Sequence, residues 1–122
     1  MRKEKKSEKE IVLEQYHPGL KKEITSEAHL EKIILKNWNK IFPFNFYAKR
    51  KKISKRSIVD IIGKSDNNYY LIELKYRPIR KTDALQIKKY IKDFKQTYGV
   101  TFFKQFLIDY NHKTERVNIY AI

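Results

Sequence analysis

The arrangement of apolar and polar residues predicts two amphipathic helices. Over residues 25–40, apolar side chains recur at near-helical spacing behind a Thr-Ser pair that is typical of an N-cap. Over residues 82–98, they follow the spacing i, i+3, i+7, i+10 and i+14, which places one apolar stripe along a helix. Thr82 or Asp83 is expected to cap this second helix, and Gly99 to end it.

Short runs rich in β-branched and aromatic residues predict five strands between and after these helices. A turn signal, Ser65-Asp66-Asn67-Asn68, separates two of them and indicates a β-hairpin. The order α-β-β-β-α-β-β is that of an α/β fold with a mixed central β-sheet flanked by helices. The predicted strands are 44–53, 57–63, 69–76, 101–110 and 116–122.

Residues 1–22 differ from the rest of the chain because charges of both signs dominate them. We expect a charged N-terminal extension here, with a frayed helix as one possibility, ended by His17-Pro18-Gly19. Residues 23–122 are then a single domain, in keeping with the total length of 122 residues.

Charge points to the class of partner. The chain carries 28 Lys and Arg against 14 Asp and Glu, a formal net charge of +14, which favours binding to a polyanion. Nucleic acid is the expected partner, and an anionic membrane surface is the weaker alternative. The absence of cysteine excludes disulfides and thiolate zinc sites. No apolar run is long enough to span a bilayer, and no secretory signal is evident, so we expect an intracellular protein without a membrane partner.

Three charged residues on the predicted hairpin carry the candidate chemistry. Glu73 and Lys75 are two residues apart, so they project from one face of their strand. An ordinary hairpin register would place Asp60 beside Glu73. Two neighbouring carboxylates repel each other unless a divalent cation lies between them, and oxygen ligands suit Mg²⁺ or Mn²⁺. A lysine beside them can hold a water molecule and offset phosphate charge.

The alternative interpretation makes the same residues a solvated ion-pair cluster. The local sequence argues against it, because Asp60 lies within IVDII and Glu73 within LIEL. Carboxylates inside such apolar strands are costly unless something compensates their charge.

These segments resemble the PD-(D/E)xK nuclease superfamily. The resemblance rests on IVDIIG and YYLIELK, on TSEAHLEKIILKNW before them and on DALQIKKYI after them, and it covers residues 25–98. The branches that look most similar are the catalytic domains of NucS-type endonucleases, followed by archaeal Holliday-junction resolvases. Val59 stands where the motif name has proline. NucS-type proteins also carry a separate N-terminal DNA-binding domain, so strand choice and substrate shape are not transferred.

The resemblance implies a restriction-endonuclease-like core and an endonuclease that hydrolyses DNA phosphodiester bonds with Mg²⁺ (or Mn²⁺). We expect this endonuclease to be structure-specific. Asp60 and Glu73 would hold the metal with the carbonyl of Leu74, and Glu27 of the first helix would assist, with Glu31 as the fallback. Lys75 would serve the nucleophile and Gln86 would orient the site. The alternatives are a junction resolvase, which requires a homodimer, and a non-catalytic nucleic-acid-binding protein that retains the fold.

Two basic runs flank the predicted hairpin strands and are candidates for phosphate contacts that ignore base sequence. A solvated surface is the alternative for each residue. Tyr90 matches the Q-x-x-x-Y pattern of the RecB-like and NucS-like branches and joins the nucleic-acid-binding candidates. The basic candidates are Lys49, Arg50, Lys51, Lys52, Lys55, Arg56, Arg77, Arg80 and Lys81.

Overall fold

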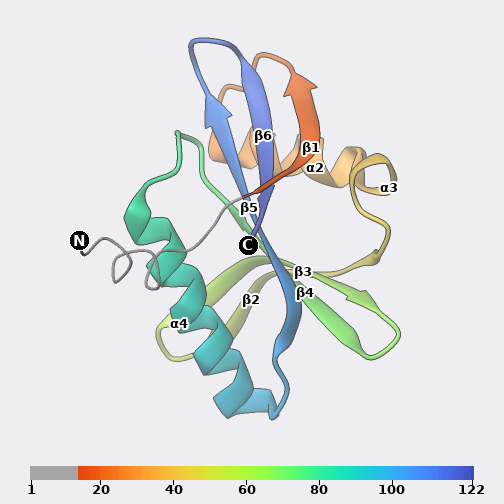
Figure 1. Cartoon of the computed structure of the whole chain (residues 1–122), viewed down its shortest axis with the longest axis vertical. Helices are drawn as coiled ribbons and strands as arrows, with labels where there is room; N and C mark the ends of the chain where they lie inside the picture. The colour runs from red at the N-terminus through yellow and green to blue at the C-terminus, as the bar shows by residue number, and fades with distance from the viewer. Residues whose placement is uncertain (1–13) are drawn as a thin grey trace, which may run out of the picture.

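The computed structural model describes residues 14–122, which form one six-stranded sheet and three helices (Figure 1). The sheet order is β1-β6-β5-β4-β3-β2, and every neighbouring pair is antiparallel except β4 and β5. In chain order, the elements are β1 (Glu14–Lys21), α2 (Glu27–Lys36), α3 (Trp38–Ile41), β2 (Asn45–Ser54), β3 (Ser57–Ser65), β4 (Asn68–Leu74), α4 (Lys81–Tyr98), β5 (Phe102–Asn111) and β6 (Arg116–Ala121).

The single parallel pair explains the mixed character of the sheet. Parallel neighbours require a crossover connection, and α4 supplies it between β4 and β5. The predicted α/β fold with a mixed sheet and flanking helices is therefore confirmed.

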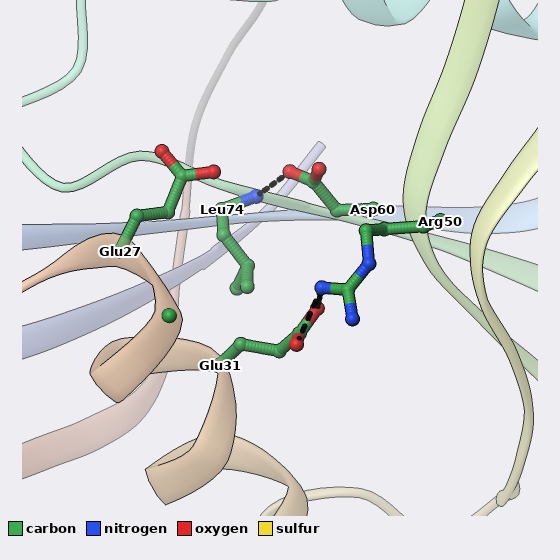
Figure 2. A pocket seen from close by; sticks show the side chains of 6 residues that line it. Glu27, Glu31, Arg50, Asp60 and Leu74 are labelled. Atoms are coloured by element: carbon green, nitrogen blue, oxygen red, sulfur yellow. Dashed lines mark hydrogen bonds and ion pairs between the residues drawn. The ribbon is translucent and has the colours of Figure 1, made fainter.

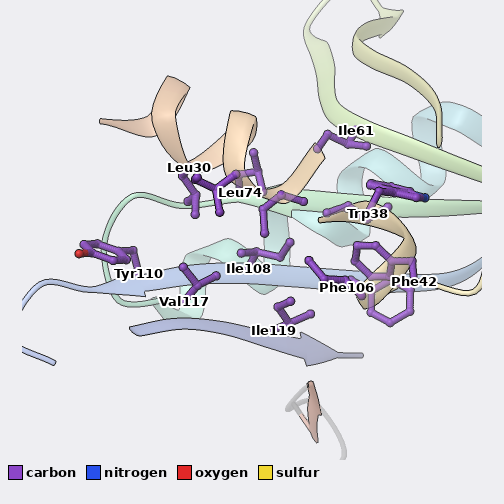
Figure 3. Close-up of a cluster of buried hydrophobic side chains, with 14 of the residues drawn as sticks. Leu30, Trp38, Phe42, Ile61, Leu74, Phe106, Ile108, Tyr110, Val117 and Ile119 are labelled. Carbon is purple, nitrogen blue, oxygen red and sulfur yellow. The ribbon is translucent and has the colours of Figure 1, made fainter. Parts of the chain in front are cut away.

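The two faces of the sheet carry separate apolar clusters. One face packs against α2 and α3 (Figure 3). There, Trp38 donates a 2.6 Å hydrogen bond to the carbonyl of Phe44. The other face packs against α4 through Ile87, Tyr90 and Phe94. Because side chains alternate along a strand, Ile72 and Leu74 of β4 enter the first cluster, and Leu71 enters the second.

The predicted hairpin forms from β3 and β4. Its register pairs Ile61 with Ile72 and Ile62 with Leu71. Continuing this register by one residue places Asp60 opposite Glu73. Strand β4 ends at Leu74 instead of reaching residue 76, but the Lys75 amide still donates a 2.8 Å hydrogen bond to Ile108 in β5.

The second half of the predicted N-terminal extension belongs to the sheet in the structure. Residues Glu14–Lys21 form an edge strand, β1, that pairs with β6 at the other end of the sequence. Pro18 does not end this strand, because an edge strand tolerates a missing N–H and the register shifts between His17 and Leu20. The sheet thus begins before the boundary predicted at residue 23. The remainder of that extension, residues 1–13, lies outside the described residues.

The first predicted helix is divided in two. Ser26 is the N-cap, as predicted, and accepts a 3.0 Å hydrogen bond from the His29 amide. The helix stops at Asn37, whose side-chain amide donates a 2.8 Å hydrogen bond to the carbonyl of Ile33. The short helix α3 follows it, so the predicted continuous helix to Lys40 is wrong.

The second predicted helix begins slightly earlier than expected. Arg80 occupies the N-cap position, and Asp83 lies in the first turn, where its carboxylate accepts a 2.6 Å hydrogen bond from the Arg80 amide. Gly99 ends the helix with a φ of 76°, the left-handed conformation expected of a C′ glycine. Within the described part of the chain, none of the helices has the length and apolarity needed to cross a bilayer.

Candidate active site

Asp60 and Glu73 face each other on neighbouring strands. Their carboxyl groups lie within hydrogen-bonding reach of each other. Glu73 is 3% exposed, and Asp60 is half-buried at the point where β3 and β4 begin to separate. Strand alternation and the hairpin register bring them together, so the sequence-based expectation of proximity holds.

Burial makes the charged forms of both acids costly. Burial, and then the negative charge of Asp60, raises the pKa of Glu73 to about 8. Burial also raises the pKa of Asp60, although the Leu74 amide opposes this by donating a 2.8 Å hydrogen bond to its carboxylate. Without a cation, the two carboxyl groups therefore share a proton near neutral pH.

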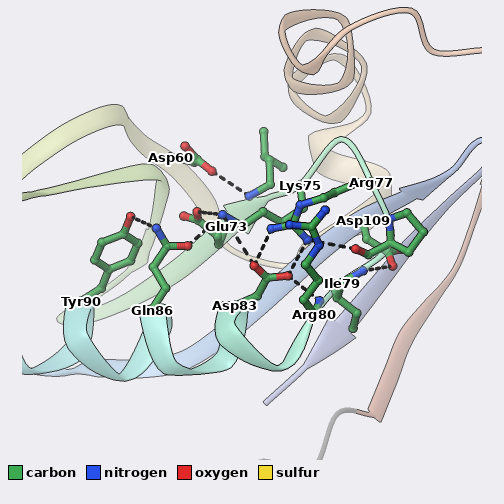
Figure 4. A network of polar contacts seen from close by, with 12 residues as sticks. Asp60, Glu73, Lys75, Arg77, Ile79, Arg80, Asp83, Gln86, Tyr90 and Asp109 are labelled. Carbon is green, nitrogen blue, oxygen red and sulfur yellow. Dashed lines mark hydrogen bonds and ion pairs between the residues drawn. The ribbon is translucent and has the colours of Figure 1, made fainter.

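Lys75 completes the cluster and is held from several directions (Figure 4). Its ammonium lies 3.2 Å from Oε2 of Glu73 and donates a 2.8 Å hydrogen bond to Oε1 of Gln86. Gln86 in turn donates a 2.9 Å hydrogen bond from its amide to the hydroxyl of Tyr90. The predicted neighbours Lys75 and Gln86 thus meet directly.

Tyr90 is largely buried beneath α4. The residue is 7% exposed and belongs to the apolar cluster on that face of the sheet. Its hydroxyl group accepts the hydrogen bond from the Gln86 amide. The predicted contact of Tyr90 with nucleic acid stays a prediction.

A pocket of about 170 Å³ opens beside Asp60 on the α2 side (Figure 2). Both candidate glutamates of α2 line it, together with Asp60 and Leu74. Glu27 is exposed at the start of the helix. Glu31 is 8% exposed, and both of its carboxylate oxygens accept hydrogen bonds from Nη1 of Arg50, at 2.8 and 2.9 Å.

The donor set fits a hard divalent cation. Oε1 of Glu73 is buried and has no hydrogen-bond partner among residues 14–122. An oxygen-ligated ion would satisfy this atom and would also relieve the repulsion between Glu73 and Asp60. No group of three or more His, Cys, Asp or Glu side chains in the described region gathers closely enough to hold a metal by itself. A cation bound here would therefore leave positions for backbone oxygen, water and phosphate, which is how Mg²⁺ is usually held.

Asp83 is a site residue that the sequence did not reveal. It is 3% exposed, and its two oxygens accept hydrogen bonds of 2.8 and 2.9 Å from the Arg77 guanidinium. Its Oδ1 lies 3.9 Å from the Lys75 ammonium. Burial opposes the charge, but the contacts with Arg77 outweigh it and lower the pKa of Asp83. A permanent negative charge therefore lies behind Lys75.

A second buried aspartate anchors the loop that leads into α4. Asp109 in β5 accepts a 3.1 Å hydrogen bond from the Ile79 amide, and burial raises the pKa of its carboxyl group. The sequence offered no signal for this contact, because Asp109 and Ile79 are joined only by the packing of the loop against β5.

The basic candidates are divided between two locations. Arg77 is engaged by Asp83, whereas Arg80 and Lys81 are exposed at the start of α4. The larger group lies along the edge strand β2 and its turn, and all of its members are exposed: Lys49, Arg50, Lys51, Lys52, Lys55 and Arg56. Both locations border the strands that carry Asp60 and Glu73, as predicted, and their contact with nucleic acid stays a prediction.

Comparisons with known proteins point to one kind of enzyme. Over 75 residues the chain is 37% identical to Endonuclease NucS of Pyrococcus horikoshii, a match that covers 61% of this chain and 30% of that protein. A crystal structure of a repair endonuclease from Pyrococcus abyssi superposes with a TM-score of 0.58 and 26% identity over 75% of this chain and 41% of the other. EndoMS in its complex with double-stranded DNA gives a TM-score of 0.53 and 26% identity over 74% of this chain and 37% of the other.

The chain thus spans well under half the length of these proteins. No family model matches the sequence. The predicted resemblance to NucS-type endonucleases is confirmed by the sequence match and by the shared fold.

Proposed function

We propose that this chain is a metal-dependent endonuclease that hydrolyses DNA phosphodiester bonds at the cluster of Asp60, Glu73 and Lys75. The observation that carries the proposal is the pair of buried, mutually repelling carboxyl groups with a fixed ammonium beside them. The similarity to repair endonucleases supports the same reaction class.

Each residue has a distinct task in this mechanism. Asp60 and Glu73 would hold Mg²⁺ or Mn²⁺, assisted by the Leu74 carbonyl and Glu27. When bound, the cation would supply Lewis-acid polarisation of the phosphoryl oxygen and a lowered pKa of water. Lys75 orients the attacking water by hydrogen bonding and offsets the charge that develops on the phosphate. Gln86 keeps the Lys75 ammonium in place between Glu73 and Asp83.

DNA is the proposed partner, and its shape is the proposed basis of selection. EndoMS binds double-stranded DNA in the complex to which this fold is similar. The exposed basic residues of β2 suit phosphate contacts, and such contacts position a duplex without reading its bases. Selection would then depend on backbone geometry, as at a flap or a branch.

A panel of labelled DNA substrates tests this function. Single strands, duplexes, flaps and four-way junctions are incubated with and without Mg²⁺, and Asp60→Asn serves as the inactive control. We expect cleavage of at least one substrate that requires the cation and is absent in the control. Tight DNA binding without any cation-dependent cleavage would favour the non-catalytic alternative, and selective four-way junction cleavage by a dimer would favour a resolvase.

A further inference from the structure

Arg50 differs from the other basic residues of β2 because its side chain lines the pocket beside Asp60. Lys49 pairs with Ile61 and Lys51 with Val59, so Arg50 lies opposite Asp60 in the sheet. Asp60 is in turn opposite Glu73. Arg50, Asp60 and Glu73 therefore form one row across three adjacent strands.

The backbone of Arg50 is unusual for an arginine. Its φ is 49°, in the left-handed region that residues with a Cβ rarely adopt. Conformations of this kind persist where the surroundings enforce them, and they are concentrated at functional sites. From this position the side chain reaches toward α2 and meets Glu31, as Figure 2 shows.

The contact with Glu31 uses only part of the guanidinium group. Nη1 donates to both carboxylate oxygens, while Nε and Nη2 have no partner among residues 14–122. The Arg50 side chain is 59% exposed, whereas that of Glu31 is 11% exposed. Glu31 thus fixes one nitrogen and leaves N–H donors available at the pocket that Arg50 and Asp60 line.

Charge also favours an anion at this place. Glu27, Glu31 and Asp60 line the same pocket and would repel a phosphate group, but Arg50 neutralises Glu31. The pocket volume of about 170 Å³ is several times the volume that one water molecule occupies in the liquid, about 30 Å³. A phosphate group fits such a space.

We propose that Arg50 binds the phosphate at which cleavage occurs, with Glu31 as the residue that positions its guanidinium. The inference rests on the proposed nuclease function and gives Arg50 a role that Lys49, Lys51 and Lys52 do not share. Those lysines are exposed and lie outside the pocket lining. They contribute affinity, whereas Arg50 acts on the reacting group.

The test compares Arg50→Ala with Lys92→Ala, which removes the same charge from an exposed position of α4 outside the basic runs. At saturating DNA and Mg²⁺, Lys92→Ala should cleave at the wild-type rate. Arg50→Ala should lower the saturating rate by about 100-fold, as expected when a preorganised donor is lost. Arg50→Lys should not restore it, because lysine lacks the planar fork. Equal saturating rates for Arg50→Ala and Lys92→Ala would overturn the proposal.

Arg50→Gly separates catalysis from folding. Glycine accepts a φ of 49° without strain, so this variant should melt at or above the temperature of Arg50→Ala. The cleavage rate of Arg50→Gly should nevertheless be as low as that of Arg50→Ala. Recovery of the rate in Arg50→Gly would show that the backbone, and not the guanidinium, matters at this position.

A binding measurement keeps this inference distinct from the nuclease function. Calorimetry with a 5′-phosphorylated thymidine dinucleotide should show affinity at least about tenfold weaker in Arg50→Ala than in Lys92→Ala. If the wild type cleaves no DNA, the proposed function fails, and this comparison still decides the phosphate contact. If the wild type cleaves and the two variants bind the dinucleotide equally, the inference fails alone.

Discussion

The ammonium group of Lys75 donates a 2.8 Å hydrogen bond to Oε1 of Gln86, which ties the end of β4 to the second turn of α4. The Tyr90 hydroxyl, held in the apolar cluster, fixes the other end of the same amide. The position of Lys75 beside Glu73 therefore depends on how α4 packs on the sheet. This dependence makes Gln86 a positioning residue whose effect on the proposed reaction is measurable.

Replacing Gln86 with Ala should slow cleavage without weakening DNA binding. The Lys75 side chain would lose a fixed partner, and small displacements of a reacting group cost about 10–100-fold in rate. Single-turnover rates and DNA dissociation constants measure the two effects separately. Leu85→Ala is the control, because Leu85 is the preceding residue of α4 and is 61% exposed. A parallel loss of rate in both variants would show that helix stability, and not Lys75, is responsible.

The stability of the metal-free chain should fall as pH rises from about 4.5 to about 8. Glu73 has an ordinary pKa of 4.5 that is raised to about 8 in the folded chain, so the folded state binds the proton more tightly than the unfolded state. Its stabilising contribution is complete at low pH and is lost as pH rises through this window. Melting temperatures in EDTA measure the decline.

Glu73→Gln provides the matched comparison for this pH dependence. The amide keeps the shape of the side chain and does not titrate. We expect its melting temperature to decline less than that of the wild type between pH 5 and pH 8. Identical pH profiles for the two proteins would mean that Glu73 titrates near its ordinary value.

The exposed lysines of β2 should account for part of the salt dependence of DNA binding. Lys51→Ala together with Lys52→Ala should reduce the slope of log K against log salt by about 0.9 per lost contact on duplex DNA, or about 0.7 on single strands. The matched control is Lys88→Ala with Lys92→Ala, two exposed lysines of α4. An unchanged slope in the β2 variant would assign Lys51 and Lys52 to the solvated surface.

Gly63 is expected not to tolerate a side chain. A Cβ at this position would overlap the ring of Phe44, which stacks on Tyr70 with ring centroids 3.8 Å apart. Gly63→Ala should therefore destabilise the chain by about 1–3 kcal/mol, as overpacking does. Urea unfolding measures the loss. Adding Phe44→Leu should cost less than the sum of the two single changes, because the smaller side chain removes the overlap.

The parts of the site that the sequence predicted are those that depend on local periodicity. Alternation along β4 places Glu73 and Lys75 on one face, and the turn between β3 and β4 sets the register that brings Asp60 opposite Glu73. The four-residue spacing of Gln86 and Tyr90 likewise follows from helix geometry.

The parts that the sequence did not predict depend on contacts between distant segments or on exceptional backbone. Strand β1 exists because β6 pairs with it, and Pro18 suggested a break instead. The sequence predicts Asp83 as a helix cap. Its ion pair with Arg77 depends on the path of the loop after β4, which the sequence does not show. In the sequence, Arg50 is one member of a basic run. Its left-handed φ directs the side chain to Glu31.

Mn²⁺ titration of Glu73→Ala and Lys75→Ala, paired with their DNA cleavage rates, tests the central claim most directly. Both variants, like Asp60→Ala, should lose cleavage while retaining DNA binding, because other basic residues supply the affinity. Glu73→Ala and Asp60→Ala should bind Mn²⁺ more weakly than the wild type, because each lacks a ligand. Lys75→Ala should bind Mn²⁺ at least as tightly, because an ammonium is no ligand and its removal takes away a like charge. Cleavage by Glu73→Ala at the wild-type rate, with unchanged Mn²⁺ affinity, would contradict the account.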